Sequence, residues 1–120
     1  AGAVAVETFG PDETIVTEGQ PGESMFIVVD GDAQASVLGE VVAHFAEGDF
    51  FGELALLTGK PRTATVRCET GAQCLVLDRA SFDVVAANNE WIFEERLRGY
   101  ESTRQEAQGL LQFIESELPS

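Results

Sequence analysis

The stretch FGELALLTGKPRTATV, residues 51–66, decides how this 120-residue sequence is interpreted. It places a glycine and a glutamate inside an apolar run, and it ends with an arginine beside small residues. No lysine or arginine precedes Lys60, yet Lys60, Arg62 and Arg67 follow one another closely. The whole chain carries a net charge of −14, so this isolated positive cluster is a feature that the function has to explain.

The residues of the stretch favour a loop followed by a short helix. Gly52 allows close approach of the backbone, and ELALL supplies good helix formers for one or two turns. The free N–H groups of a helix start beside Arg62 would bind an anion, while Glu53 would face neutral hydroxyls or Arg62. Together these groups describe a sugar phosphate. The alternative is a surface helix and a proline turn with a solvated arginine, and the residues alone favour neither.

Composition limits the classes of function. The length and the 44% hydrophobic content fit one globular domain, residues 1–120. Twenty-one acids and a pI near 4.1 disfavour binding to nucleic acid or to an anionic membrane. One histidine and two cysteines are too few for a zinc site or a disulfide framework, so Cys68 and Cys74 are predicted to be reduced, half-buried thiols. No segment has the length of a membrane span, and the chain reads as cytoplasmic and as excised from a longer protein.

Short strands separated by turn signals fill the sequence up to about residue 77. This spacing predicts a mainly β fold with C-terminal α, namely an antiparallel β-roll (jelly-roll-like, about eight strands) over residues 4–77. TATVRC and CLVL are predicted to form a hairpin around residues 69–73. The other predicted strands are residues 3–9, 14–19, 24–29, 33–39 and 40–45.

From residue 78 to about 118 the periodicity becomes helical. Asp78 is the predicted N-cap of a first helix over residues 78–88. A second, longer helix follows, with a possible break at Gly99 or Gly109. The final apolar cluster, in GLLQFIESELPS, has no evident cover in this chain and predicts a missing neighbour.

Residues 51–66 closely resemble the phosphate-binding cassette of the cyclic nucleotide-binding domain family. The family pattern, Phe-Gly-Glu-(Leu/Ile)-Ala-Leu followed by a loop and Pro-Arg-(Ala/Thr)-Ala-(Thr/Ser)-Val, is matched without a gap. Upstream, EGQPGESMFIVVDGDA matches the family's glycine-bearing turn and strand. CLVLDRASF is similar to the segment that leads into the helices of eukaryotic cyclic-nucleotide-dependent kinases, above all in their second nucleotide-binding domain. The resemblance covers roughly residues 4–105.

The resemblance implies a role for each cassette position. Glu53 would accept a hydrogen bond from the ribose 2′-hydroxyl, and Arg62 would pair with the exocyclic phosphate. Gly52 would let the backbone close on the ribose, and Leu56 matches the apolar residue that packs against the moving helix. Other predicted ligand contacts come from the same cassette and from the strand before it. They are Leu54, Ala55, Thr63, Ala64, Val42 and Ala43.

The purine preference stays open between cGMP and cAMP. Thr63 stands where family members selective for guanine often carry a hydroxyl. Ala43 stands where second domains of cGMP-dependent kinases carry a guanine-reading arginine, which this chain lacks.

Tyr100 is the predicted lid over the base. It lies 22 residues after Asp78, the spacing of the base-capping tyrosine in the second domain of the kinase regulatory subunits that this region resembles. It also follows Gly99, where a helix can bend. Trp91 and Phe93 are predicted to pack on the roll instead, and a cap from a missing neighbour is the alternative to Tyr100.

The function implied is that of a non-catalytic regulatory sensor. Binding of cGMP or cAMP would move the C-terminal helices and control an adjacent kinase or a second nucleotide-binding domain in the full-length protein. The alternative is a structural roll that no longer binds nucleotide and serves as an interaction module. A metal-dependent enzyme on a similar roll would need a histidine cluster, which a single histidine does not supply. No catalytic residue, metal ligand or cofactor is predicted.

Overall fold

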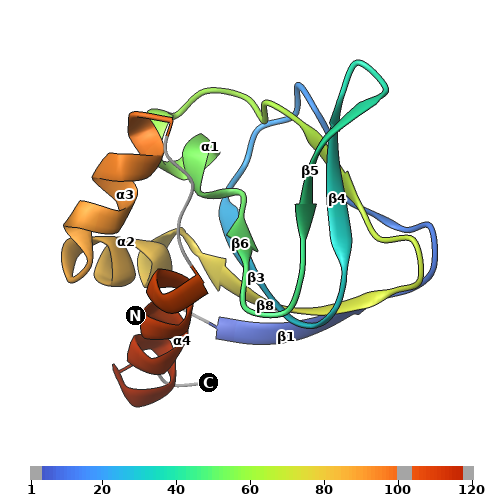
Figure 1. The fold of residues 1–120 in the computed structure, drawn as a ribbon. Coiled ribbons are helices and arrows are strands. Elements are labelled where there is room, and N and C mark those ends of the chain that lie inside the picture. The colour runs from blue at the N-terminus through green and yellow to red at the C-terminus, as the bar shows by residue number, and fades with distance from the viewer. Residues whose placement is uncertain (1–3, 100–103, 118–120) are drawn as a thin grey trace.

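The computed structural model describes residues 4–99 and 104–117, which form two facing sheets with helices against one side (Figure 1). Both sheets are antiparallel in every pairing, which confirms the predicted β-roll with C-terminal α. The first sheet has the order β1 (Val4–Phe9), β8 (Ala72–Asp78), β3 (Ser24–Gly31) and β6 (Phe50–Phe51). The second has the order β2 (Thr14–Val16), β7 (Thr65–Arg67), β4 (Ala33–Val37) and β5 (Glu40–Phe45).

Two hydrophobic cores lie on opposite faces of the first sheet. Successive side chains of a strand point to opposite faces, so β3 sends Met25 and Ile27 into one core and Phe26 and Val28 into the other. We call the set between the two sheets the roll core. Its buried members are Phe9, Phe26, Val28, Ala33, Ala35, Phe51, Val66, Cys68, Ala72 and Cys74.

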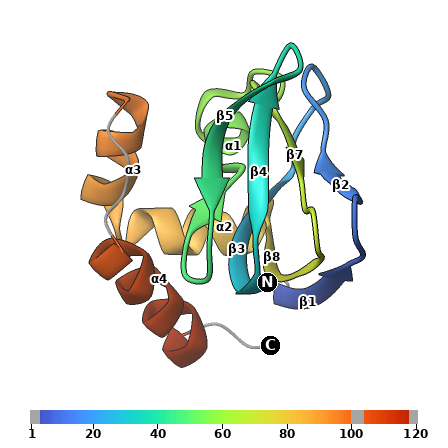
Figure 2. The ribbon, with the colours of Figure 1, turned by 45° about the vertical axis from the view of Figure 1, so that its right-hand side comes forward.

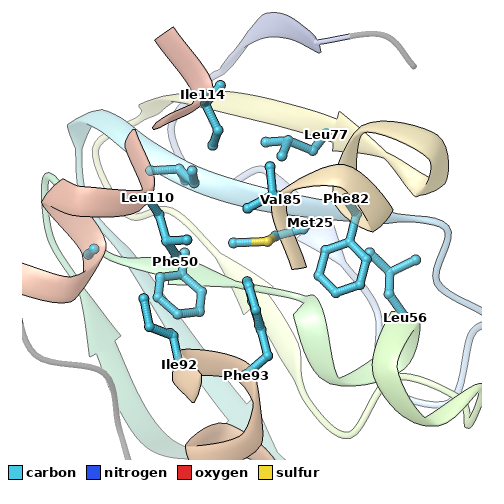
Figure 3. Close-up of a cluster of buried hydrophobic side chains, with 12 residues drawn as sticks. Met25, Phe50, Leu56, Leu77, Phe82, Val85, Ile92, Phe93, Leu110 and Ile114 are labelled. Carbon is cyan, nitrogen blue, oxygen red and sulfur yellow. The ribbon is translucent and has the colours of Figure 1, made fainter. Parts of the chain in front are cut away.

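The helix core lies between the first sheet and the helices, and Figure 3 shows it. Its buried members are Met25, Ile27, Phe50, Leu56, Leu77, Phe82, Val85, Ile92, Phe93, Ala107, Leu110 and Ile114. The helices that contribute are α1 (Glu53–Thr58), α2 (Arg79–Ala87), α3 (Glu90–Leu97) and α4 (Arg104–Glu117). None of the helices in residues 4–99 and 104–117 is long and apolar enough to cross a membrane.

The helix boundaries follow local signals. The Asp78 carboxylate accepts the Ser81 N–H at 2.9 Å, which confirms Asp78 as the N-cap of α2. The predicted second helix is divided, because Gly99 has a φ of +91° and α3 ends before it. Gly109 lies inside α4 and causes no break.

The C-terminal apolar cluster is covered within this chain, so the predicted missing neighbour is wrong for it. Ala107, Leu110 and Ile114 of α4 are buried in the helix core, beside Met25 and other side chains of the first sheet (Figure 3). The sequence pattern showed an apolar helix face, but only the return of α4 to the roll reveals its cover.

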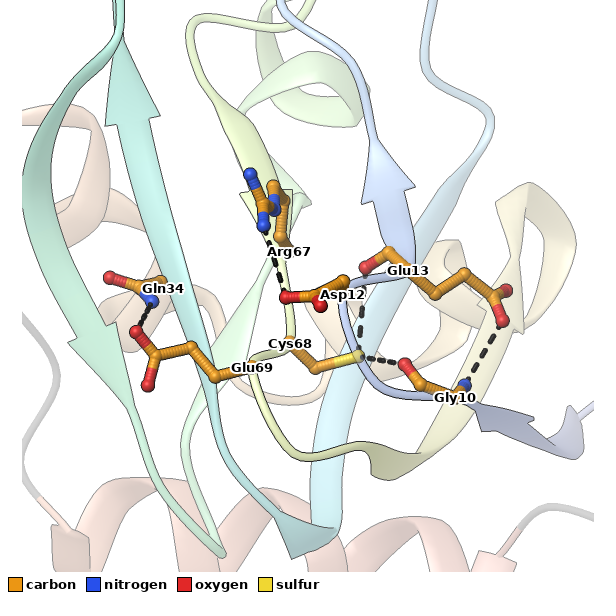
Figure 4. Close-up of polar contacts among 7 residues, drawn as sticks. All are labelled: Gly10, Asp12, Glu13, Gln34, Arg67, Cys68 and Glu69. Carbon is orange, nitrogen blue, oxygen red and sulfur yellow. Dashed lines mark hydrogen bonds and ion pairs between the residues drawn. The ribbon is translucent and has the colours of Figure 1, made fainter.

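The predicted hairpin of TATVRC and CLVL is also wrong, because β7 and β8 belong to different sheets. Figure 4 shows how the chain is held at this crossing. The Cys68 thiol donates to the carbonyls of Gly10 and Glu13 at 3.1 and 3.6 Å, and the Cys68 N–H donates to the Glu13 carbonyl at 3.1 Å. The start of this link is therefore tied to the β1–β2 turn rather than folded back on β8. Cys68 and Cys74 are fully buried free thiols, not half-buried ones.

Candidate functional site

A cavity of about 160 Å³ opens where the cassette meets the inner face of the second sheet. Seven predicted ligand residues line it together: Gly52, Glu53, Leu54, Ala55, Arg62, Thr63 and Ala64. The remaining lining residues were not predicted as ligand contacts. They are Val16, Ala35, Phe45, Phe51, Val66 and Arg96.

Arg62 is held rigidly at the wall of this cavity. Its Nη1 donates to the Gly52 carbonyl at 2.8 Å, and its Nη2 donates to the Ser24 carbonyl at 2.9 Å. The guanidinium carbon lies 5.8 Å from the centre of the Phe26 ring, and only 8% of the residue is exposed. A guanidinium has five N–H donors, so these two bonds fix its plane and leave donors for an anion.

The loop before β3 fixes the Arg62 backbone through two hydrogen bonds, and it also passes close to the Arg62 side chain. The Arg62 N–H donates to the Gln20 carbonyl, and the Gly19 N–H donates to the Arg62 carbonyl, both at 2.8 Å. A Cβ on Gly22 would lie 2.5 Å from the guanidinium, so any other residue there would displace Arg62. Gly22 therefore belongs to the site as a positioning residue, and its signal in the sequence was the glycine-bearing turn.

The electrostatics of Arg62 reflect its burial. Loss of water lowers the pKa of Arg62 from its ordinary value, and the carboxylates of Glu53 and Glu23 oppose this shift. An anionic ligand would add a further opposite charge beside the same guanidinium. Anion binding at Arg62 stays a prediction.

Glu53 is almost completely buried, with 1% of the residue exposed. The Nε of Arg96 in α3 donates to Glu53 Oε1 at 2.6 Å, and Nη2 of the same guanidinium lies 2.6 Å from this oxygen in an ion pair. The second carboxylate oxygen of Glu53, Oε2, is also buried. It has no hydrogen-bond partner among the described residues. A buried carboxylate oxygen without a donor is costly, so this atom favours a ligand that brings an N–H or O–H group.

Of the other predicted site residues, Val42, Ala43 and Leu56 are not among the described residues that line the cavity. Val42 is 59% exposed, and it falls at a bulge of β5 where the register against β4 shifts. Ala43 packs against the roll core, opposite Ala35, which does line the cavity. Tyr100 lies outside the described residues. The predicted relay residue, Leu56, is buried in the helix core, and Figure 3 shows it near Phe82.

Sequence reasoning missed two kinds of residue at the cavity. Arg96 is 43 positions from Glu53, and no motif in the sequence joins them. Phe45 and Phe51 form an aromatic wall with ring centres 5.0 Å apart, and Phe51 stacks on Phe26 at 5.1 Å. The apolar alternation of the strands could have indicated this wall, whereas nothing local indicated Arg96. Within residues 4–99 and 104–117 no group of acids, cysteines and histidine is arranged to hold a metal ion.

Comparison with known proteins adds a family assignment. The profile of the cyclic nucleotide-binding domain matches residues 6–89. A cGMP-dependent protein kinase of Toxoplasma gondii is 38% identical over 86 residues, which cover 72% of this chain and 9% of the kinase. A cAMP-dependent protein kinase regulatory subunit of Colletotrichum orbiculare is 40% identical over 85 residues, which cover 68% of this chain and 22% of that subunit.

The fold has a matching solved structure. The regulatory domain of Toxoplasma gondii PKA, crystallised with cAMP, superposes with a TM-score of 0.74 at 30% identity. The match covers 82% of this chain and 40% of that one. The chain therefore spans well under half the length of these relatives.

Proposed function

The chain belongs to the cyclic nucleotide-binding domain family, and from this premise we propose that it is a regulatory sensor of a 3′,5′-cyclic purine nucleotide, cGMP or cAMP. The domain would bind its ligand without chemical change and act on a neighbouring domain. A protein kinase, or a second nucleotide-binding domain, is the proposed neighbour, because the relatives are kinases and kinase regulatory subunits.

One observation carries this proposal. Two buried groups of opposite kind, the fixed guanidinium of Arg62 and the partnerless Oε2 of Glu53, line one cavity. A cyclic nucleotide brings an anionic phosphate and a ribose hydroxyl in one rigid molecule. The phosphate would take the spare donors of Arg62, and the hydroxyl would donate to Oε2. Thr63 lines the same cavity and remains the proposed contact for guanine.

Helix α3 connects the cavity with the helix core, because side chains of α3 contact both. Arg96 binds Glu53 directly, and Phe93 of the same helix packs in the helix core with Leu56. A ligand hydroxyl at Glu53 would therefore change the surroundings of a carboxylate that α3 already holds. Movement of the helices would be the proposed output of binding.

The test is calorimetric titration of the chain with cGMP and with cAMP. Arg62→Ala removes the anion partner, and we expect affinity to fall by about 30-fold to several-thousand-fold, the cost of a lost buried charge pair. Glu53→Ala should cost less, because it removes one sugar contact. Lys60→Ala is the matched control, since Lys60 is an exposed cation two residues from Arg62 and lies outside the cavity wall.

Two outcomes would contradict the proposal. Binding of Arg62→Ala within threefold of the parent would show that the phosphate lies elsewhere. If the parent binds neither nucleotide, the alternative of a structural roll that serves as an interaction module replaces the sensor.

We also propose Tyr100 as the cap over the purine. Stacking of a base on an aromatic ring contributes roughly 1–3 kcal/mol. Tyr100→Ala should therefore weaken binding about 5- to 150-fold, mainly through faster release, while Tyr100→Phe keeps the ring and should be nearly neutral. Stopped-flow dissociation of a fluorescent cyclic nucleotide measures the rates. Equal release from the parent and Tyr100→Ala would assign the cap to another residue or domain.

A further inference from the structure

A second, larger hollow lies between α3 and α4, helices that sit on the same side of the roll (Figure 2). Its volume is about 480 Å³, and among the residues that the structure describes it shares no lining residue with the cavity at the cassette. The residues around it are Asn89, Trp91, Ile92, Gln105, Glu106 and Gly109. We call it the α3–α4 groove. Ile92 is buried in the helix core together with Leu110 of α4, so the groove has a firmly packed base.

Trp91 lines one side of the α3–α4 groove, and it is unusual in being a largely exposed tryptophan. It is the only tryptophan in the chain, and 57% of it is exposed while its neighbours Ile92 and Phe93 are buried. The prediction that Trp91 packs on the roll is therefore wrong, although it holds for Phe93. An exposed tryptophan beside a groove is typical of a binding hot spot, because it offers a large apolar area with few rotatable bonds.

Gly109 keeps the opposite wall open. A Cβ at this position would have no atom within 4 Å, so no close contact in the structure requires glycine there. Glycine inside a helix costs about 1 kcal/mol relative to alanine. The α4 helix carries this cost at the position where a side chain would enter the groove.

The charge around the groove selects the kind of partner. Among the described residues that line the groove, Glu106 is charged and none is basic. Over the helices as a whole, the described side chains carry four carboxylates in residues 79–99 and three in residues 105–117, against three arginines. Two of those arginines pair with carboxylates outside these segments, Glu23 and Glu53, which leaves Arg98 as the third. Together with the net charge of −14, this surface repels nucleic acid, anionic membranes and a second copy of the chain. It attracts a basic segment, whose cations can also lie over the face of Trp91.

We propose that the α3–α4 groove is a docking site for a lysine- and arginine-rich amphipathic segment of a partner protein. Its apolar side chains enter between Trp91 and Gly109, and its cations face the acidic helices. The described residues that line this groove are not among those that line the cavity at the cassette, so the two sites can be altered separately by substitution.

The single tryptophan makes the test direct. The probe is a synthetic amphipathic helix of lysine and leucine, and the control probe replaces each lysine by glutamate. We expect a saturable change in Trp91 fluorescence with the basic peptide and none with the acidic one. Raising the salt from about 0.05 to 0.5 M should weaken the binding, because it screens the acidic surface. No saturable change with the basic peptide, or equal binding of the acidic one, would overturn the proposal.

Two variants locate the site. Gly109→Leu places a side chain in open space within the groove and should weaken peptide binding at least tenfold, while the better helix former keeps the chain folded. Leu97→Ala is the control, because Leu97 is an exposed apolar residue of α3 that lies outside the groove. Undiminished binding by Gly109→Leu, or a loss with Leu97→Ala instead, would place the peptide elsewhere. Cyclic nucleotide titration of Gly109→Leu should match the parent, so failure here is distinct from failure of the sensor function.

Discussion

Phe50 and Phe51 are adjacent in the sequence, yet they belong to different cores. The ring of Phe50 lies 6.0 Å from that of Phe93 in the helix core, whereas Phe51 stacks on Phe26 in the roll core and lines the cavity at the cassette. The helix core contains Leu56 of the cassette and side chains of α2, α3 and α4, while the roll core is built from strands. The two-residue strand β6 thus lies at the boundary between the roll core, which borders the cavity, and the helix core, which joins the helices to the first sheet.

The difference between the two cores bears on how the proposed binding signal would reach the helices. The cavity borders the roll core on one side, and the helix core reaches the same cassette through Leu56 and the Arg96–Glu53 pair. The roll core is closed by strand pairing on both sheets, whereas α3 and α4 are joined to it mainly by side-chain packing. Elements held by packing alone open more readily than paired strands.

Replacement of each phenylalanine by alanine tests this division. We expect Phe50→Ala and Phe51→Ala each to lower the free energy of unfolding by about 3–5 kcal/mol, the usual cost of a cavity in a core. Hydrogen exchange should separate them, because Phe50→Ala should raise exchange mainly in α3 and α4, and Phe51→Ala across both sheets. Phe→Leu variants serve as milder versions if either alanine variant fails to fold. The same exchange pattern in both would mean that the two cores unfold as one.

The roll core also holds a titratable group. Burial, followed by the nearby Cys68 and Glu7, raises the pKa of Cys74 from 9.0 to about 11. The folded state therefore keeps this proton where the unfolded state loses it. Its stability contribution is complete below pH 9 and is lost as the pH rises from about 9 through 11, amounting to about 2 kcal/mol.

Denaturant unfolding at pH 8 and pH 11 measures this loss. Cys74→Ala should be less stable than the parent at pH 8 because of its cavity, but its stability should fall less between the two pH values. An equal fall in both proteins would show that Cys74 does not titrate in this range.

The smallest expected effect concerns the polar link between the two regions. Arg96→Met keeps most of the side-chain length but leaves Glu53 without its partner, so we expect a loss of about 1–2 kcal/mol, reduced from that of a fully buried pair by the partial exposure of Arg96. Arg79→Met breaks the exposed Arg79–Glu23 pair and should cost less than about 1 kcal/mol. Thermal unfolding compares the two variants. Equal losses would mean that the Arg96 link contributes no more than a surface ion pair.

Most of the site could be predicted because the cassette is continuous. Gly52, Glu53 and Arg62 lie within sixteen consecutive residues, so their resemblance to the family's cassette could be recognised in the sequence and predicts that they lie together. The same is true of the Asp78 cap and of β3, whose apolar residues mark a strand buried on both faces. In each case the responsible interaction is local, and local interactions leave a pattern in the chain.

The remaining features depend on how distant elements are oriented. The sequence determined the cassette and the strands of the roll, and it limited the helix break to Gly99 or Gly109, of which the structure has the break at Gly99. Only the tertiary structure decided that Arg96 reaches Glu53, that Gly22 lies against Arg62, and that α4 returns to cover its own apolar face. These contacts join elements far apart in sequence, and their geometry follows from how the packed sheets and helices turn relative to one another. No period or motif within a single segment encodes that relative orientation.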